Sequence, residues 1–160
     1  MNDDYWMKAA LALARKAGME GEVPVGAIVV LEGEIIGKGW NQPISSCDPT
    51  AHAEVVALRE AARKVGNYRL VNAELFVTLE PCSMCAGAIV HSRIKRLVYG
   101  AHEPKAGVVK SQQHFFEQSY LNHRPEIVSG ICSEESSEIL QNFFRERRSE
   151  KADQKNSDES

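Results

Sequence analysis

Apolar residues follow two different periods along this chain, and each period predicts a type of element. Near the start they recur every three or four residues, which predicts an amphipathic helix over residues 4–19. These residues are Trp6, Ala9, Ala10, Leu13 and Ala17. Residues 25–31 and 34–38 are instead rich in β-branched side chains, so we expect two strands there. Glu32 and Gly33 between them are typical of a short hairpin connection.

The same two patterns alternate through the rest of the chain. We expect helices over residues 52–64, 82–92 and 134–148, and strands over residues 73–79, 94–100 and 126–131. The resulting order, α-β-β-α-β-α-β-(α)-β-α, predicts an α/β fold in which helices cover both faces of one sheet. Residues 101–125 are long enough for a crossover, so the fourth and fifth strands should run parallel. Asp48 and Thr50 are candidates to cap the helix that starts near residue 52.

Length and composition favour one domain. A chain of 160 residues, 43% of them hydrophobic, can bury one substantial core but not comfortably two. We assign residues 1–149 to this domain and residues 150–160 to a disordered polar tail, in which Ala152 is the one apolar residue. The sequence has no apolar run of membrane-spanning length, and its acidic start is unlike a secretory signal. We therefore expect a cytoplasmic protein that does not bind a membrane.

Two short motifs supply the candidate chemistry. His52 and Glu54 form a His-X-Glu motif, and Cys82 and Cys85 form a Pro-Cys-X-X-Cys motif. Zinc prefers four tetrahedral ligands, and catalytic sites usually take three from the protein and keep the fourth position for water. His52, Cys82 and Cys85 make three, since two cysteines three positions apart share one helical face. Glu54 is a surplus carboxylate that could shuttle protons, so the pattern indicates a hydrolytic zinc site between two helix N-termini.

Two other interpretations of the cysteines stay open at this point. In a closed structural zinc site, Cys47 or Cys132 would supply a fourth ligand. In a thioredoxin-like redox pair, the two cysteines of the Pro-Cys-X-X-Cys motif would form a disulfide, but the His-X-Glu motif would then have no role. The simplest assignment leaves Cys47 and Cys132 as ordinary free cysteines.

Several further segments carry a resemblance to a known family. They are residues 22–27, 39–41, 48–54, 67–70, 78–82, 91–94, 122–124 and 143–145. Together with the two motifs, these segments resemble the bacterial tRNA-specific adenosine deaminases of the zinc-dependent cytidine/deoxycytidylate deaminase superfamily. The similarity runs in order from residue 5 to about residue 148.

The resemblance implies a fold, a reaction and a partner. The implied fold is a cytidine-deaminase-like three-layer α/β/α sandwich with a central five-stranded mixed sheet, formed by a zinc-dependent deaminase domain over residues 1–149. The implied reaction is hydrolytic deamination of the wobble adenosine to inosine in a tRNA anticodon stem-loop, typically of an arginine tRNA carrying ACG. One zinc ion per subunit would be bound by His52, Cys82 and Cys85, with Glu54 as the catalytic proton shuttle. The family also implies a homodimer.

Three further positions are candidates for substrate binding near the site. By the resemblance, Asn41 matches a residue that hydrogen-bonds the flipped base, and Val25 matches an apolar pocket wall. An asparagine after Trp40 is also typical of a turn cap, and Val25 of an ordinary strand. Glu103 stands where the family commonly has aspartate near the substrate strand, so its longer side chain could alter a contact with the flanking ribose.

RNA contacts are expected on the final helix. The formal net charge of -3 argues against a generally basic surface, so the positive charge must act locally. Arg145, Arg147 and Arg148 cluster with Phe143 and Phe144, which combines phosphate-pairing groups with aromatic surfaces for unpaired bases. In the family such a helix contacts the anticodon loop. We expect Phe144 and Arg147 or Arg148 to make these contacts.

Two alternative functions share parts of the pattern. A deaminase of free cytosine, guanine or their nucleosides would use the same His-X-Glu and Pro-Cys-X-X-Cys motifs, and only the flanking segments and the final helix favour tRNA. A noncatalytic RNA-binding module stabilised by zinc would need a closed site with four protein ligands. Glu54 disfavours this second alternative.

Overall fold

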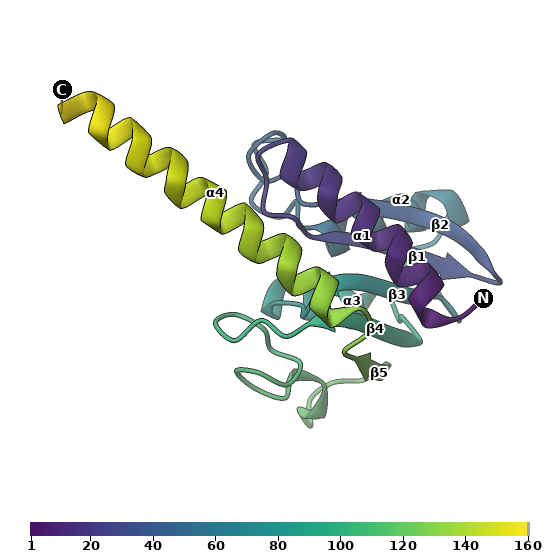
Figure 1. Ribbon diagram of the computed structural model, residues 1–160. Helices are drawn as coiled ribbons and strands as arrows, with labels where there is room; N and C mark the ends of the chain where they lie inside the picture. Colours follow the sequence, from purple (N-terminus) through teal and green to yellow (C-terminus); the bar gives the residue numbers. More distant parts are fainter. Residues whose placement is uncertain (160) are drawn as a thin grey trace.

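The elements of the structure follow the alternation that the sequence predicts. The computed structural model describes residues 1–159 (Figure 1). The elements are α1 (Asp3–Met19), β1 (Gly26–Leu31), β2 (Glu34–Trp40), α2 (Ala53–Val65), β3 (Glu74–Leu79), α3 (Ser83–His91), β4 (Arg96–Ala101), the 3₁₀ helix η1 (Phe115–Glu117), β5 (Glu126–Ser129) and α4 (Ser133–Glu159). The helix expected between β4 and β5 is thus only the short η1.

A single mixed sheet of five strands has the order β2-β1-β3-β4-β5. Strand β1 pairs antiparallel with both β2 and β3, whereas β3, β4 and β5 run parallel to one another. The predicted parallel pairing of the last two strands is confirmed. Because parallel strands end at the same edge of a sheet, the segments that follow β3 and β4 begin side by side.

The hairpin between β1 and β2 turns at the predicted pair of residues. Glu32 has φ 51° and Gly33 has φ 76°, and Leu31 pairs with Glu34 across the turn. Two consecutive positive φ values belong to the tight hairpin turns whose twist matches that of the flanking strands. The turn sets the register of the two pairs beside it, and an irregularity between Val29 and Val30 shifts the register along the rest of the hairpin.

Helices cover both faces of the sheet and give the three-layer sandwich that the sequence predicts. Helices α1 and α4 lie side by side on one face, and the core there is made by Trp6, Met7, Leu11, Phe76 and neighbouring residues. Helices α2 and α3 pack on the other face over a larger cluster that includes Val77, Ile89 and Tyr99. The core thus lies in two layers, one on either side of the sheet.

Helix α2 packs unusually close to β2 at Gly39. A Cβ atom at this position would collide with the carbonyl oxygen of Ala53 and the backbone nitrogen of Ala57. Glycine is therefore required by the close approach of the helix. The contact holds the first turn of α2 next to the end of β2, which is where the His-X-Glu motif begins.

Helix α4 is longer than the sequence predicts. The expected helix ends at residue 148 and is followed by a disordered tail, whereas the structure continues α4 to Glu159. Residue 160 lies outside the described residues. Six of the eleven residues in this extension are glutamate, lysine, glutamine or alanine, which have high helix propensity, and its residues 149–158 are exposed. Figure 1 shows this part extending away from the sheet.

None of the helices within residues 1–159 is both long enough and apolar enough to cross a membrane. In α4, the longest of them, charged and polar side chains predominate.

Arg96, the first residue of β4, joins the start of α1 to the start of β3. Its two terminal nitrogens donate to the two carboxylate oxygens of Asp3 at 2.7 and 2.6 Å, and one of them also donates to Glu74 at 2.9 Å. Hydrogen bonds from Arg96 hold the pKa of Asp3 below its ordinary value, against the opposing effect of partial burial. The Asp3 side chain is 25% exposed, so the ion pair is only partly screened by solvent.

We expect Asp3→Asn to lower the free energy of unfolding at pH 7 by about 1 kcal/mol. A carboxyl whose pKa is lower in the folded state adds stability above its unfolded pKa of 3.8, and this stability is lost as the pH falls through the folded value. The difference between variant and parent should therefore shrink below about pH 4. Urea unfolding of variant and parent at pH 7 and pH 3 measures this difference in the free energy of unfolding. Asp4→Asn, at the same helix end but without the ion pair, is the control, and equal losses in both variants would contradict the prediction.

Candidate active site

Three potential metal ligands converge at the N-termini of two helices. His52 is the N-cap residue of α2, Cys82 is the N-cap residue of α3, and Cys85 lies in the first turn of α3. The Nδ1 atom of His52 lies 3.6 Å from Sγ of Cys82 and 3.5 Å from Sγ of Cys85. All three ligand atoms lie within 4.8 Å of one another. The structure therefore brings together the three residues that the sequence singles out.

The spacing of these atoms fits a zinc ion. Zinc–sulfur bonds of about 2.3 Å and zinc–nitrogen bonds of about 2.0 Å, set at the tetrahedral angle, place a sulfur and a nitrogen ligand about 3.5 Å apart. The observed separations of 3.6 and 3.5 Å agree with this value. Two thiols and one imidazole are also the donor types that zinc prefers.

The pKa values of the two cysteines move in opposite directions when no metal ion is bound. The hydrogen bond from Cys85, helped by His52, lowers the pKa of Cys82 to about 4 despite its burial. The same hydrogen bond and burial raise the pKa of Cys85. The protein by itself thus favours one thiolate and one thiol at this place. A divalent cation that neutralises both sulfurs would allow both cysteines to be thiolates, which is the metal-binding form.

Glu54 lies beside this cluster in the first turn of α2. The residue is only 4% exposed, and burial is the main reason that its pKa rises to about 7. A carboxyl with a pKa near neutrality can both take up and release a proton at working pH. Glu54 therefore has the property required of a general acid and base.

A cavity of about 250 Å³ opens against the cluster. Its lining consists of Val23, Val25, Asn41, Pro43, His52, Glu54, Leu79, Glu80, Cys82, Glu103 and Ala106. Pockets for drug-sized ligands usually occupy roughly 300–1,000 Å³, so this cavity suits a smaller group such as one nucleobase. Val25, Asn41 and Glu103 are all among the lining residues.

Asn41 has a second role that its pattern also allows. Its side-chain oxygen accepts a hydrogen bond from the backbone N–H of Ala53 at 2.8 Å. Asn41 thus caps α2 from a neighbouring element. The expectation that Asp48 or Thr50 caps this helix is wrong, because Asp48 instead accepts hydrogen bonds from the backbone and hydroxyl of Thr50. The cap comes from a residue that only the tertiary structure brings close.

One charged residue of the cavity lining, Glu80, is not singled out by the sequence patterns. Glu80 lies between β3 and the cysteine motif and lines part of the cavity, and its side chain is fully buried. Burial alone would raise the pKa of Glu80, but hydrogen bonds donated by Lys110, Ser111 and Glu103 lower it to about 2. The sequence gives one signal, which is an acidic residue at the end of an apolar strand. A carboxylate at such a position needs partners if it is buried.

The expected RNA contacts lie on α4 and do not line the cavity. Phe144 is 43% exposed and Arg148 is also exposed. Arg147 instead donates a hydrogen bond to the carbonyl oxygen of Gly21 at 2.6 Å, and its guanidinium lies 5.1 Å from the centre of the Phe143 ring. Arg147 therefore ties α4 to the segment before β1, while Phe144 and Arg148 face solvent.

Neither of the other two cysteines joins the metal cluster within the part of the chain that the structure describes. Cys47 is exposed and contacts the carbonyl oxygen of Ile44, and the thiol of Cys132 lies 3.6 Å from a carboxylate oxygen of Asp4. The cluster therefore has three protein ligand candidates and a neighbouring carboxylate. This arrangement favours an open catalytic site over a closed structural one.

Comparison with known proteins agrees with this geometry. The family model for the cytidine and deoxycytidylate deaminase zinc-binding region matches residues 1–101. The fold and the metal cluster thus define a zinc-binding deaminase domain. A tRNA-specific adenosine deaminase of Haemophilus influenzae is 55% identical over 150 residues, which cover 93% of this chain and 87% of the relative. A Bacillus subtilis protein with the same name is 44% identical, and the match covers 96% of each chain.

A solved structure leads to the same family. It comes from a study of A-to-I editing by tRNA:A34 deaminases at the wobble position of transfer RNA. The match has a TM-score of 0.83 and 48% identity, and it covers 85% of this chain and 99% of the other. The chain belongs to the family of tRNA-specific adenosine deaminases.

Proposed function

We propose that this protein is a zinc-dependent tRNA deaminase that converts adenosine to inosine at the wobble position of an anticodon stem-loop, with an arginine tRNA carrying ACG as the expected substrate. The observation that carries the proposal is a buried glutamate beside a zinc-type ligand cluster, in a cavity suited to one nucleobase. The names of the relatives support adenosine in tRNA as the substrate.

His52, Cys82 and Cys85 would hold the zinc ion, and Glu54 would move the protons. When bound, zinc supplies a Lewis acid that lowers the pKa of water toward neutrality. Glu54, with its pKa near 7, takes a proton from the attacking water and delivers it to N1 of adenine. As the first proton moves, the water oxygen forms a bond to C6. Glu54 then takes the proton of the resulting C6 hydroxyl and gives it to the C6 amino group. The C6–N bond breaks as the C6=O bond forms, ammonia leaves, and inosine remains.

Asn41 and Val25 would orient the base. The side-chain oxygen of Asn41 is engaged by Ala53, so its amide NH₂ is the group directed to an acceptor on the base. Val25 is buried at 5% exposure in the cavity wall and offers an apolar surface to the ring. Glu103 lies at the same wall, where it would meet the ribose of the flanking nucleotide.

We expect zinc-loaded protein to form inosine from an ACG anticodon stem-loop and none from a matched stem-loop with guanosine at the wobble position. Nucleoside mass spectrometry measures the product. Free cytosine, guanine and their nucleosides should remain unchanged. Activity confined to those small substrates would replace the proposal with a free-base deaminase.

Two variants separate the metal ligands from the proton shuttle in the same assay. Glu54→Gln should keep one zinc per chain and lose inosine formation by at least about a hundredfold, because it cannot transfer the proton. Cys85→Ala should lose both zinc and activity, because two ligands hold the ion poorly. Metal content is measured by plasma mass spectrometry. Normal turnover in Glu54→Gln would refute its assigned role.

Phe144 and Arg148 are proposed to contact the RNA, with Arg147 acting chiefly through its hold on α4. Phe144→Ala should raise the KM for the stem-loop about fivefold or more, since stacking one base on an aromatic ring contributes about 1–3 kcal/mol. The logarithm of the binding constant should fall with the logarithm of salt concentration. Arg148→Ala should make this slope shallower by about 1, because one phosphate contact is lost. Lys64→Ala, on the opposite face of the sheet, is the control. Unchanged binding in both variants would remove α4 from the RNA site.

The active form is proposed to be a homodimer in which the partner subunit helps to build the RNA site, located in the cytoplasm with its tRNA substrate. This proposal rests on the family. Light scattering of the zinc-loaded protein should give twice the mass of one chain across the working concentration range, and a monomeric mass with full activity would contradict it.

A further inference from the structure

The carboxylate of Glu80 is enclosed by the loop that follows β4. Its side chain is fully buried, at 0% exposure. Backbone N–H groups of Val109, Lys110 and Ser111 donate to one carboxylate oxygen at 3.0, 2.9 and 3.0 Å. The other oxygen accepts the backbone N–H of Glu103 at 3.1 Å and the hydroxyl of Ser111. Four backbone donors of one loop thus meet at a single buried anion.

The loop after β4 packs closely against Glu80 and its neighbours in the chain. A Cβ atom at Gly107 would lie 2.5 Å from Cδ and 2.7 Å from Oε1 of Glu80, so only glycine fits there. The backbone of Glu80 also donates to Ala101 at 2.9 Å, and Val108 donates to the carbonyl oxygen of Pro81 at 3.0 Å. Backbone hydrogen bonds therefore connect the start of the cysteine motif both to the end of β4 and to the loop that follows it.

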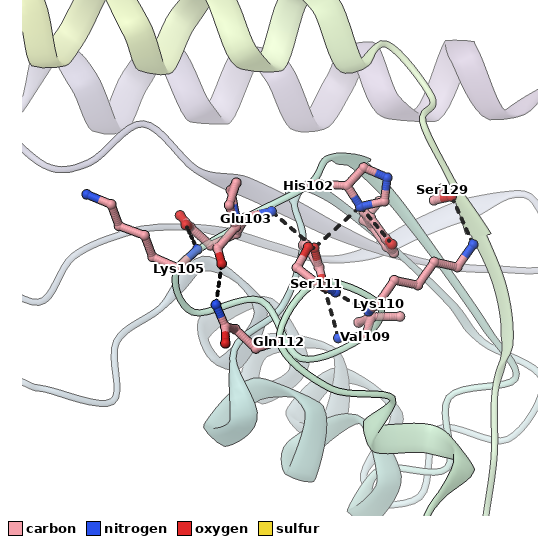
Figure 2. A network of polar contacts seen from close by, with 11 residues as sticks. His102, Glu103, Lys105, Val109, Lys110, Ser111, Gln112 and Ser129 are labelled. Atoms are coloured by element: carbon pink, nitrogen blue, oxygen red, sulfur yellow. Dashed lines mark hydrogen bonds and ion pairs between the residues drawn. The ribbon is translucent and has the colours of Figure 1, made fainter.

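Figure 2 shows how the remaining polar contacts of this loop are arranged. Val109, Lys110 and Ser111 lie on its inner turn, and Lys110 extends to Ser129 at the end of β5, 3.3 Å away. The carboxylate of Glu103 accepts the N–H of Lys105 at 2.9 Å, so this side chain is fixed by its own loop. The loop contains no strand or helix before η1. Its shape depends on these contacts, with Glu80 at their centre.

The same loop forms part of the cavity wall. Glu103 and Ala106 line the cavity together with Asn41, Glu54 and Cys82. The backbone N–H of Glu103 is itself one of the donors to Glu80. A change in the position of the Glu80 carboxylate would therefore move the wall that faces the substrate.

We propose that Glu80 is a positioning residue, an internal anion around which residues 102–111 fold so that Glu103 and Ala106 form the wall that receives the substrate nucleotide. This inference rests on the proposed function. Glu80 acts through the loop and not on the reacting atoms. Loss of the carboxylate leaves four N–H groups directed at an empty space and frees the wall to move.

Three variants test the proposal on the full-length, zinc-loaded protein. Glu80→Gln replaces one acceptor oxygen with an NH₂ group that meets N–H donors, Glu80→Ala removes the carboxylate, and Gly107→Ala displaces it. In all three, kcat/KM for the stem-loop should fall by about ten- to a hundredfold, mainly through KM, while zinc stays at one per chain. Asp3→Asn is the control, because it removes a structural carboxylate at a distant site and should leave KM unchanged.

Added formate distinguishes positioning from general stability. Glu80→Ala leaves an anion-sized space lined by backbone donors, so formate should recover at least about a third of the lost kcat/KM at constant ionic strength. Gly107→Ala has no such space and should not respond. Parent enzyme in the same formate concentrations corrects for any direct inhibition. Glu80→Ala activity that formate does not change would overturn the role of the carboxylate as an anchoring anion.

Hydrogen exchange gives a readout that needs no substrate. The amides of Val109, Lys110 and Ser111 should exchange slowly in the parent and at least about tenfold faster in Glu80→Ala, which removes the oxygen that accepts all three. If the parent makes no inosine but this difference is found, the proposed function fails and the loop anchor stands. Equal exchange in parent and variant, unchanged KM, or loss of zinc from Glu80→Gln would each overturn the inference.

Discussion

Parallel pairing of β3 with β4 is the constraint on which the site depends. It starts the cysteine motif and the loop of residues 102–111 from the same end of the parallel strands, so these two segments become neighbours although most of α3 and all of β4 lie between them in the chain. Helix α2 packs closely against Gly39 of β2. This contact places the start of α2, with His52 and Glu54, beside the cysteine motif. Ligands, proton carrier and cavity wall then come from three separate connections held by one rigid sheet.

Three buried glutamates have different pKa values because their surroundings differ. Burial dominates at Glu54 and raises its pKa to about 7. Glu80 is also buried, but the donors of a whole loop lower its pKa to about 2. Burial opposes ionisation at Glu22 as well, yet hydrogen bonds from Ser45 and Ile44 lower its pKa. The first group can exchange a proton near neutrality, whereas the other two favour the charged form and accept hydrogen bonds from the backbone.

Local patterns predicted most of the fold because periodic burial and turn chemistry act over a few residues. The order of elements, the Glu32-Gly33 hairpin and the parallel last strands agree with the structure. The prediction was wrong at the cap of α2, since Asn41 lies twelve residues from its partner Ala53. It also differed at the C-terminus, where residues expected to be disordered continue α4. Residues 149–158 of this helix are exposed, so it continues there without burying an apolar face.

The sequence by itself determined the chemical groups: an imidazole, two thiols spaced for one helical face, and a carboxylate two residues from the histidine. Motif spacing expresses which side chains a short element can present together, so it is visible without a fold. Only the tertiary structure decided how each group behaves. The 3.5–3.6 Å separations of the ligand atoms, the burial of Glu54 and the enclosure of Glu80 all arise between segments distant in the chain. Desolvation and convergent hydrogen bonds are properties of packing, and no local pattern encodes them.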